Sequence, residues 1–164
     1  MSKPIMRHKK PEWRNVALAV RQPWASLICY GIKDLENRPW TTDYRGRLFI
    51  LASKTNESSK VKELPRKIQK VINKYLDSEI FPPLKSLPKS AVIGYVDLKD
   101  CCLEPVKNIW SNNGGWEVYN VNWILENAYL FDEPQLIGIK GKENLFEIPE
   151  LDPDNLPPAH KVKL

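Results

Sequence analysis

Histidine and cysteine are scarce in this 164-residue chain, and their scarcity excludes several kinds of site. The two histidines, His8 and His160, lie near opposite ends, so no spacing resembles a zinc site, and we predict no metal and no cofactor. The three cysteines are an odd number, and Cys101 and Cys102 are neighbours, which argues against a disulfide framework. A reducing compartment, the cytoplasm, is the location consistent with these observations.

Long apolar runs are also missing. No stretch approaches the roughly 18 apolar residues that span a bilayer, and no apolar run follows the basic N-terminal residues as it would in a secretory signal. We therefore expect no membrane partner. The chain has the length of one domain and an ordinary globular composition, with 42% hydrophobic and 27% charged residues. We predict a flexible basic arm at 1–14, one domain at 15–150 and an extended tail at 151–164, and we assume a monomer.

The net charge of +5 is unevenly distributed. Residues 1–14 contain five Lys or Arg against one acid, and residues 60–74 contain six against one. Segregated positive charge suits a polyanion-binding surface, because each neutralised phosphate releases counterions. A solvated helix face and tail would have the same composition. Charge alone therefore leaves the function open.

The apolar patterns predict strands for most of the chain. The predicted strands are 16–20, 47–51, 91–98 and 119–125, followed by a hairpin of 136–140 with 144–148. A short helix is expected from Pro23 to a stop at Gly31, and a longer one over 65–76 with its cations on one face. Gly94 indicates a bulge or a close backbone approach. Because the loops are too short for crossovers, a small, mostly antiparallel barrel is the economical architecture.

Several motifs follow one another in a fixed order along the chain. They are Arg21-Gln22-Pro23-Trp24-Ala25, then Gly31-Ile32-Lys33-Asp34-Leu35-Glu36-Asn37-Arg38-Pro39-Trp40, Tyr44-Arg45-Gly46, and the later segments 94–98, 123–127 and 139–149. Together they resemble the signature of ASCH domains, a branch of the PUA-like superfamily, over residues 15–150. The resemblance implies a PUA-like small β-barrel of the ASCH type, mainly β with short helices. It also implies binding of nucleic acid, with RNA expected, or of a nucleotide, in a basic cleft beside the barrel.

The resemblance also implies the binding residues. In the family, a G-x-K-x-x-E-x-R motif lines the cleft. The residue types suit this role: Lys33 and Arg38 can meet phosphates, Trp24 and Trp40 can stack on bases, and amides can read base edges. The predicted nucleic-acid-binding residues are Arg21, Gln22, Trp24, Lys33, Glu36, Asn37, Arg38, Trp40, Tyr44, Arg45, Ser53 and Lys54.

Plainer interpretations and other functions stay open at this point. Lys33, Glu36 and Arg38 also fit a structural ion-pair cluster, and Trp24 fits the apolar face of its helix. Some ASCH relatives are enzymes that cleave RNA or hydrolyse the acetyl amide of acetylcytidine. In a metal-independent hydrolase of this kind, Lys33 would be base or nucleophile and Glu36 would orient it or transfer protons. Leu51 stands where many relatives have a histidine, so imidazole acid–base chemistry is missing and a ribonuclease is less favoured. A protein-interaction domain is the third possibility.

Overall fold

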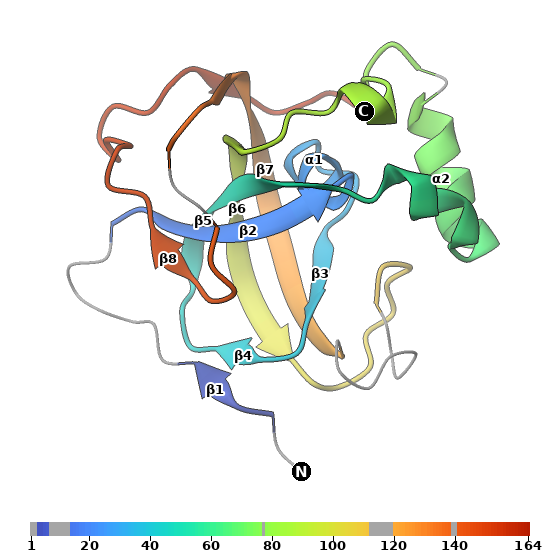
Figure 1. Ribbon diagram of the computed structural model, residues 1–164. Helices are drawn as coiled ribbons and strands as arrows, with labels where there is room; N and C mark the ends of the chain where they lie inside the picture. Colours follow the sequence, from blue (N-terminus) through green and yellow to red (C-terminus); the bar gives the residue numbers. More distant parts are fainter. Residues whose placement is uncertain (1–2, 7–13, 77, 112–119, 139–140) are drawn as a thin grey trace.

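The computed structural model describes residues 3–6, 14–76, 78–111, 120–138 and 141–164. Within these residues the main element is a seven-stranded mixed sheet with the order β3–β7–β6–β5–β2–β8, to which β9 is added beside β7 (Figure 1). Its strands are β2 (Val16–Gln22), β3 (Leu35–Arg38), β5 (Gly46–Asn56), β6 (Ala91–Cys102), β7 (Val121–Gln135), β8 (Phe146–Glu147) and β9 (Ala159–His160). Two further short strands, β1 (Ile5–Met6) and β4 (Thr41–Thr42), pair in parallel.

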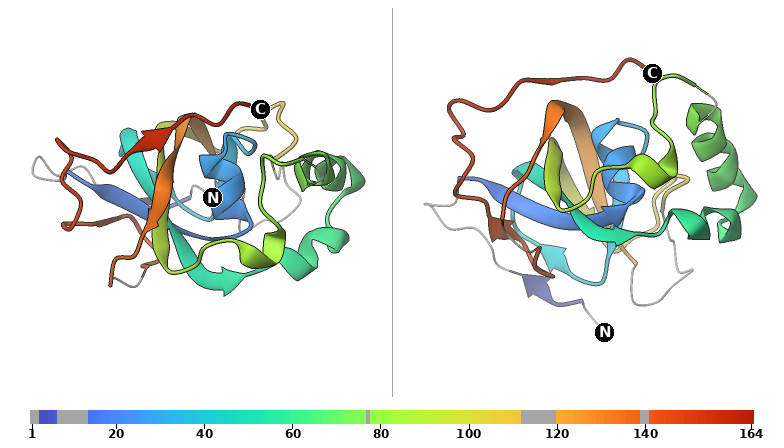
Figure 2. Two further views of the ribbon diagram at one scale, coloured as in Figure 1. Left: turned by 90° about the horizontal axis from the view of Figure 1, so that it is seen from above. Right: turned by 45° about the horizontal axis from the view of Figure 1, so that its top comes forward.

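Short helices accompany these strands. They are α1 (Trp24–Cys29), α2 (Arg66–Leu76) and the 3-10 helices η1 (Ser58–Glu63) and η2 (Leu84–Ser86). The view from above shows α1 close against the sheet, whereas η1 and α2 lie to one side of it (Figure 2). The prediction of a mainly β fold with short helices is therefore confirmed.

The sheet differs from the expected barrel in two respects. Its strand path runs from β3 to β8, and no backbone pairing between described residues joins these two ends, so the sheet is not closed. In addition, β2 and β5 pair in parallel, from Ala17 opposite Phe49 to Val20 opposite Ala52. Residues 23–45, which contain α1, β3 and β4, form the crossover that a parallel pair needs. Each loop within residues 23–45 is short, but the whole connection is long enough to join two parallel strands.

The predicted hairpin of 136–140 with 144–148 does not form. Residues 136–138 lie outside any strand, 139–140 are outside the described residues, and β8 pairs with β2 instead, with Val16 opposite Glu147. The edge of β2 is open to a partner there, and Phe146 becomes buried in an apolar cluster with Phe49. The burial of the Phe146 ring against the sheet thus favours the pairing of β8 with β2 over the predicted hairpin.

The apolar residues form three clusters around the sheet. The first lies between α1 and the sheet and contains Ile28, Cys29 and Trp123. The second lies under α2, where Ile68 and Ile72, four residues apart on one helical face, are buried. The third lies where C-terminal residues cover part of the sheet. The predicted helix over 65–76 is thus present, and it is held by its apolar face.

The chain outside the predicted domain takes part in the structure at both ends. Ile5 and Met6 pair with β4, whereas residues 7–13 of the predicted arm lie outside the described residues. In the tail, Leu151 is buried and β9 pairs with β7, with Ala159 opposite Phe131. No helix in the described part of the chain has the length and apolar character needed to cross a membrane.

Gly94 of β6 provides a test of the packing between α1 and the sheet. A Cβ at this position would lie 2.1 Å from the backbone oxygen of Tyr129 and 3.0 Å from Sγ of Cys29. We therefore expect Gly94→Ala to lower the free energy of unfolding by about 3 kcal/mol, the upper end of the usual range for overpacked cores. Gly138→Ala is the control, because a Cβ there meets no atom within 4 Å. Equal denaturation midpoints for the two variants would contradict the close approach.

Candidate functional site

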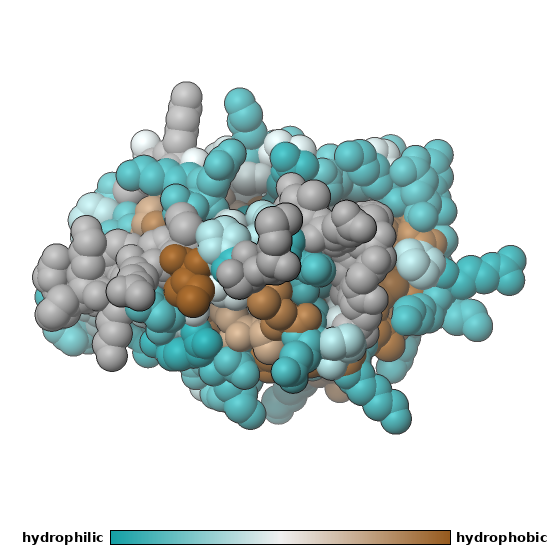
Figure 3. Space-filling model, turned by 90° about the horizontal axis from the view of Figure 1, so that it is seen from below, coloured by the Kyte–Doolittle hydropathy of each residue, from teal (hydrophilic) through white to brown (hydrophobic). Residues whose placement is uncertain are grey.

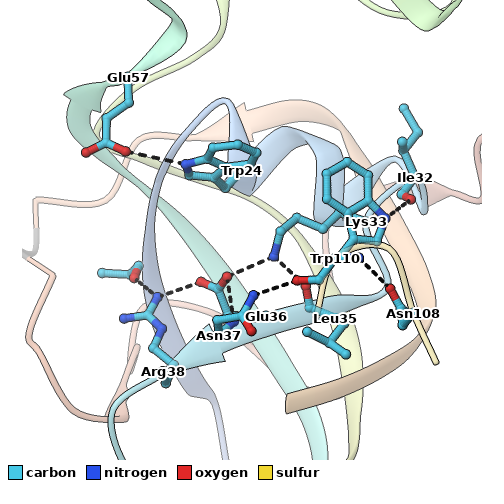
Figure 4. A network of polar contacts seen from close by, with 11 residues as sticks. Trp24, Ile32, Lys33, Leu35, Glu36, Asn37, Arg38, Glu57, Asn108 and Trp110 are labelled. Atoms are coloured by element: carbon cyan, nitrogen blue, oxygen red, sulfur yellow. Dashed lines mark hydrogen bonds and ion pairs between the residues drawn. The ribbon is translucent and has the colours of Figure 1, made fainter. Parts of the chain in front are cut away.

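Glu36 lies between the two cations of the predicted motif (Figure 4). Its Oε1 accepts a hydrogen bond of 2.9 Å from Nζ of Lys33, and its Oε2 accepts one of 3.1 Å from Nη2 of Arg38. Glu36 and Arg38 are two residues apart on β3 and therefore face the same side. Lys33 precedes the strand, in the turn after α1, where its N–H donates to the carbonyl oxygen of Leu27. Lys33 and Glu36 are only 5% and 9% exposed, so the three charges meet inside the protein.

Lys33, Glu36 and Arg38, here called the Glu36 cluster, are also hydrogen-bonded to the backbone on both sides. Nζ of Lys33 also donates to the carbonyl oxygen of Leu35, and Nη2 of Arg38 donates to that of Ala19 at 2.8 Å. Ala19 belongs to β2, which is not a neighbour of β3 in the sheet. The guanidinium of Arg38 therefore connects two strands that share no ladder. Its Nε is buried and makes no hydrogen bond with any residue that the structure describes.

The charge state of Glu36 follows from these neighbours. Burial by itself raises the pKa of this carboxyl, but the positive charges of Lys33 and Arg38 and the hydrogen bonds from Lys33 and the Asn37 N–H more than offset it. The pKa of Glu36 is consequently below its ordinary value, and the carboxylate is ionised at neutral pH.

A second carboxylate, Glu57, holds the predicted residues Arg21 and Trp24, and Figure 4 shows its contact with Trp24. It accepts hydrogen bonds from Nη1 of Arg21 at 2.7 Å and from Nε1 of Trp24 at 3.4 Å, and it lies 3.6 Å from Nζ of Lys60. Burial raises the pKa of Glu57, but these hydrogen bonds and charges outweigh burial and lower it overall. Sequence reasoning missed Glu57, because a single acid in a polar loop carries no local signal.

Three other predicted binding residues make hydrogen bonds or ring contacts with other parts of the protein. Gln22 is fully buried, where its amide donates to the carbonyl oxygen of Pro88 at 2.8 Å and accepts the N–H of Ser26 at 3.0 Å. The amide of Asn37 donates to the carbonyl oxygen of Trp110 at 2.8 Å. Trp40 is 8% exposed. Its ring packs edge-on against Trp123, with 4.8 Å between centroids. The structure thus places the ring of Trp40 in the core, where it offers no open face for a base.

The remaining predicted residues lie apart from the Glu36 cluster. The hydroxyl of Tyr44 donates to the carbonyl oxygen of Arg47, and Arg45 pairs with Asp100 at 3.1 Å. Ser53 and Lys54 lie near the end of β5. Lys54 is exposed, and no described acid pairs with it. Among the predicted cations, then, Lys33, Arg38, Arg21 and Arg45 each have a carboxylate partner.

One cavity touches the motif. It has a volume of about 350 Å³ and lies between the end of α1, β7 and the C-terminal residues. Gly31 and Lys33 contribute to its wall, and its rim carries Asp34 and Glu126 as well as Lys161. This mixture of charges differs from the basic cleft that the sequence predicted. In the part of the chain that the structure describes, no cluster of His, Cys, Asp and Glu could hold a metal ion.

Comparison with known proteins decides the family. A family model described as "ASCH domain" matches residues 18–135, well over half of the chain. The chain belongs to the ASCH domain family. The match covers β2 to β7, including the Glu36 cluster, α2 and the Glu57 contacts.

Relatives of this ASCH chain are known in larger proteins. Activating signal cointegrator 1 from Homo sapiens is 41% identical over 85 residues, and the protein of that name from Mus musculus is 40% identical over the same length. These residues are 51% of this chain and 14% of either relative, so the chain spans a small part of the curated proteins that it matches. A crystal structure of ASCH from Zymomonas mobilis aligns at 12% identity and a TM-score of 0.45, covering 84% of this chain and 89% of that one.

The Glu36 cluster predicts that loss of the Glu36 charge alone strongly lowers the stability of the fold. Glu36→Gln leaves the cations of Lys33 and Arg38 buried without a counter-charge, so we expect it to lower the free energy of unfolding by about 3–5 kcal/mol. Glu57→Gln removes an ion pair whose arginine side chain is 63% exposed, and we expect a loss below about 1 kcal/mol. Denaturant titration of both variants measures the difference, and a Glu36→Gln loss no larger than that of Glu57→Gln would show that the cluster is not structural.

Glu36 also predicts an acid dependence of stability. A carboxyl whose pKa is lowered on folding contributes stability that is complete above its pKa in the unfolded chain, about 4.3. That contribution disappears as the pH falls through the lower pKa of the folded state. We expect unfolding free energies measured across acidic pH to decline less steeply in Glu36→Gln than in the unmodified chain. Parallel curves would contradict the lowered pKa of Glu36.

Proposed function

We propose that this ASCH domain binds nucleic acid, with RNA as the expected ligand, and that residues 54–89 supply most of the phosphate contacts. The observation that carries the proposal is the location of the net charge. Residues 54–89 contain nine Lys or Arg and four Asp or Glu, and this excess of +5 equals the net charge of the whole chain. A surface of this kind attracts a polyanion and releases its counterions on binding.

The cations of α2 support the proposal because they are accessible. Arg66, Lys67 and Lys70 are exposed, and no described carboxylate lies within ion-pair distance of them. Lys74 lies over the ring of Tyr75, 5.4 Å from its centroid. Figure 3 shows long hydrophilic side chains projecting from the side of the molecule where α2 lies. The cations of the motif, in contrast, form ion pairs with carboxylates of the same chain.

Trp24 links the motif to residues 54–89, here called the cationic segment. It is partly exposed, and its indole is held by Glu57, which belongs to residues 54–89. A strand of RNA on α2 would therefore have an aromatic ring within the same footprint, and stacking of one base is worth about 1–3 kcal/mol. We propose that the cytoplasmic monomer is the binding form.

Charge reversal on α2 tests the phosphate contacts. We expect Lys67→Glu combined with Lys70→Glu to weaken binding of a single-stranded RNA of mixed sequence and to reduce the slope of log affinity against log salt by about 2. The control is Lys99→Glu with Lys142→Glu, which changes the net charge equally at exposed positions outside residues 54–89. Fluorescence anisotropy at several salt concentrations measures both slopes. Affinity that does not depend on salt, or equal losses in the two double variants, would refute the proposal.

A second candidate is a metal-independent hydrolase that acts on a modified nucleoside or on RNA. The observation in its favour is the burial of Lys33 beside Glu36 within the family motif. Nζ of Lys33, however, makes hydrogen bonds to Glu36 and to the carbonyl oxygen of Leu35, and attack on a substrate would require it to give up these contacts.

We therefore expect no release of acetate from acetylcytidine and no shortening of RNA when either is incubated with the protein. Chromatography of the products measures both. Turnover that is lost in Lys33→Ala and retained in Lys54→Ala would replace the binding proposal with the hydrolase.

A further inference from the structure

A groove of about 460 Å³ lies between η1, α2 and η2, within the cationic segment. Its apolar lining comes from Val61, Leu76 and Leu84, one residue from each element. The volume falls within the usual range of ligand pockets, about 300–1,000 Å³. None of these residues belongs to the motif from Gly31 to Trp40.

The uncharged polar lining of the groove consists of amide and hydroxyl groups. Gln69 is fixed, because its Nε2 donates to the carbonyl oxygens of Leu64 at 2.6 Å and Lys62 at 3.1 Å, which leaves its Oε1 as an acceptor. Asn73, one turn further along α2, is exposed and makes no side-chain hydrogen bond with any described residue. Ser59 adds an exposed hydroxyl. The groove therefore offers both donors and acceptors beside an apolar surface.

Positive charges lie beside this lining. Successive residues of an α-helix are about 100° apart, so Gln69, Asn73 and Leu76 fall on one narrow stripe, and Arg66 and Lys70 both lie on the same flank of it. Lys62 of η1 lines the groove directly. A strand whose phosphates contact these cations would have its bases at the mouth of the groove.

We propose that the groove between η1, α2 and η2 receives one unpaired base of the bound nucleic acid, with Asn73 contacting the base edge. A base has flat apolar faces and an edge with donors and acceptors, and single-stranded RNA is usually recognised through such unstacked bases. The apolar lining matches the faces of the base, and the amide of Asn73 matches its edge. The nearby cations match the phosphate of the same nucleotide. The inference rests on the proposed function, because the phosphate contacts bring the strand to the groove.

The test separates base contacts from phosphate contacts. Binding of a short single-stranded RNA is compared with binding of an equally long strand of abasic ribose phosphates, at one salt concentration and with the full chain. We expect the unmodified protein to bind the RNA about tenfold more tightly, as stacking and edge contacts to one base allow. Asn73→Ala should reduce this ratio several-fold, whereas Asn155→Ala, a change at an exposed asparagine outside the groove, should leave it unchanged. A second variant, Ser59→Tyr, fills the groove and should reduce the ratio further.

Each other outcome has a definite meaning. Equal binding of the two strands overturns the base site and leaves the phosphate contacts standing. A preference for RNA that persists in both groove variants places the base contact elsewhere and also overturns the inference. If neither strand binds, both the base site and the proposed function are refuted. A nucleoside monophosphate that binds alone and is lost in Asn73→Ala supports the same base chemistry with a free nucleotide as its source. A polyglutamate peptide that competes as well as RNA would show an acidic protein partner instead.

Discussion

The fold depends on an ion cluster that connects two strands lacking a common ladder. The sheet path ends at β3, yet Arg38 of β3 reaches the carbonyl oxygen of Ala19 on β2, and Glu36 joins Arg38 to Lys33. Buried charges are costly to desolvate, so such a cluster persists only where each charge has a partner. Side chains thus connect β3 to β2 where backbone hydrogen bonds would do so in a closed barrel. The most recognisable residues of the family motif are in this way part of the framework.

This framework also determines which positive charges of the chain have carboxylate partners. Glu36, Glu57 and Asp100 pair with the cations of the motif, whereas residues 54–89 carry a net charge of +5. Long-range attraction depends on such uncompensated charge, whereas paired and buried cations contribute little to it. The basic stretch that the sequence predicted on one helical face therefore has more unpaired positive charge than the motif does.

The sequence predicted the elements whose signals are local, and it failed where distant segments meet. The apolar run of β2, the helical spacing of Ile68 and Ile72 and the close approach at Gly94 could all be recognised from neighbouring residues. The parallel pairing of β2 with β5, the pairing of β8 with β2 and the burial of Trp40 depend on contacts far apart in the chain. For the same reason the sequence showed Lys33, Glu36 and Arg38 as a set that fits either a binding site or an ion-pair cluster without deciding between the two, and it gave no sign of Glu57.

The motif and α2 are nevertheless physically connected, because they share one apolar cluster. Ile68 and Ile72 of α2 pack in the same cluster as Ile32 and Leu35, the residues on either side of Lys33 and Asp34. The Glu36 cluster fixes β3, β3 positions Leu35, and Leu35 contributes to the surface on which α2 rests. A motif that holds this surface in place can thus be essential for a ligand that it does not touch. In this ASCH domain the conformation of the motif would support binding, and the exposed side of α2 would make the contacts.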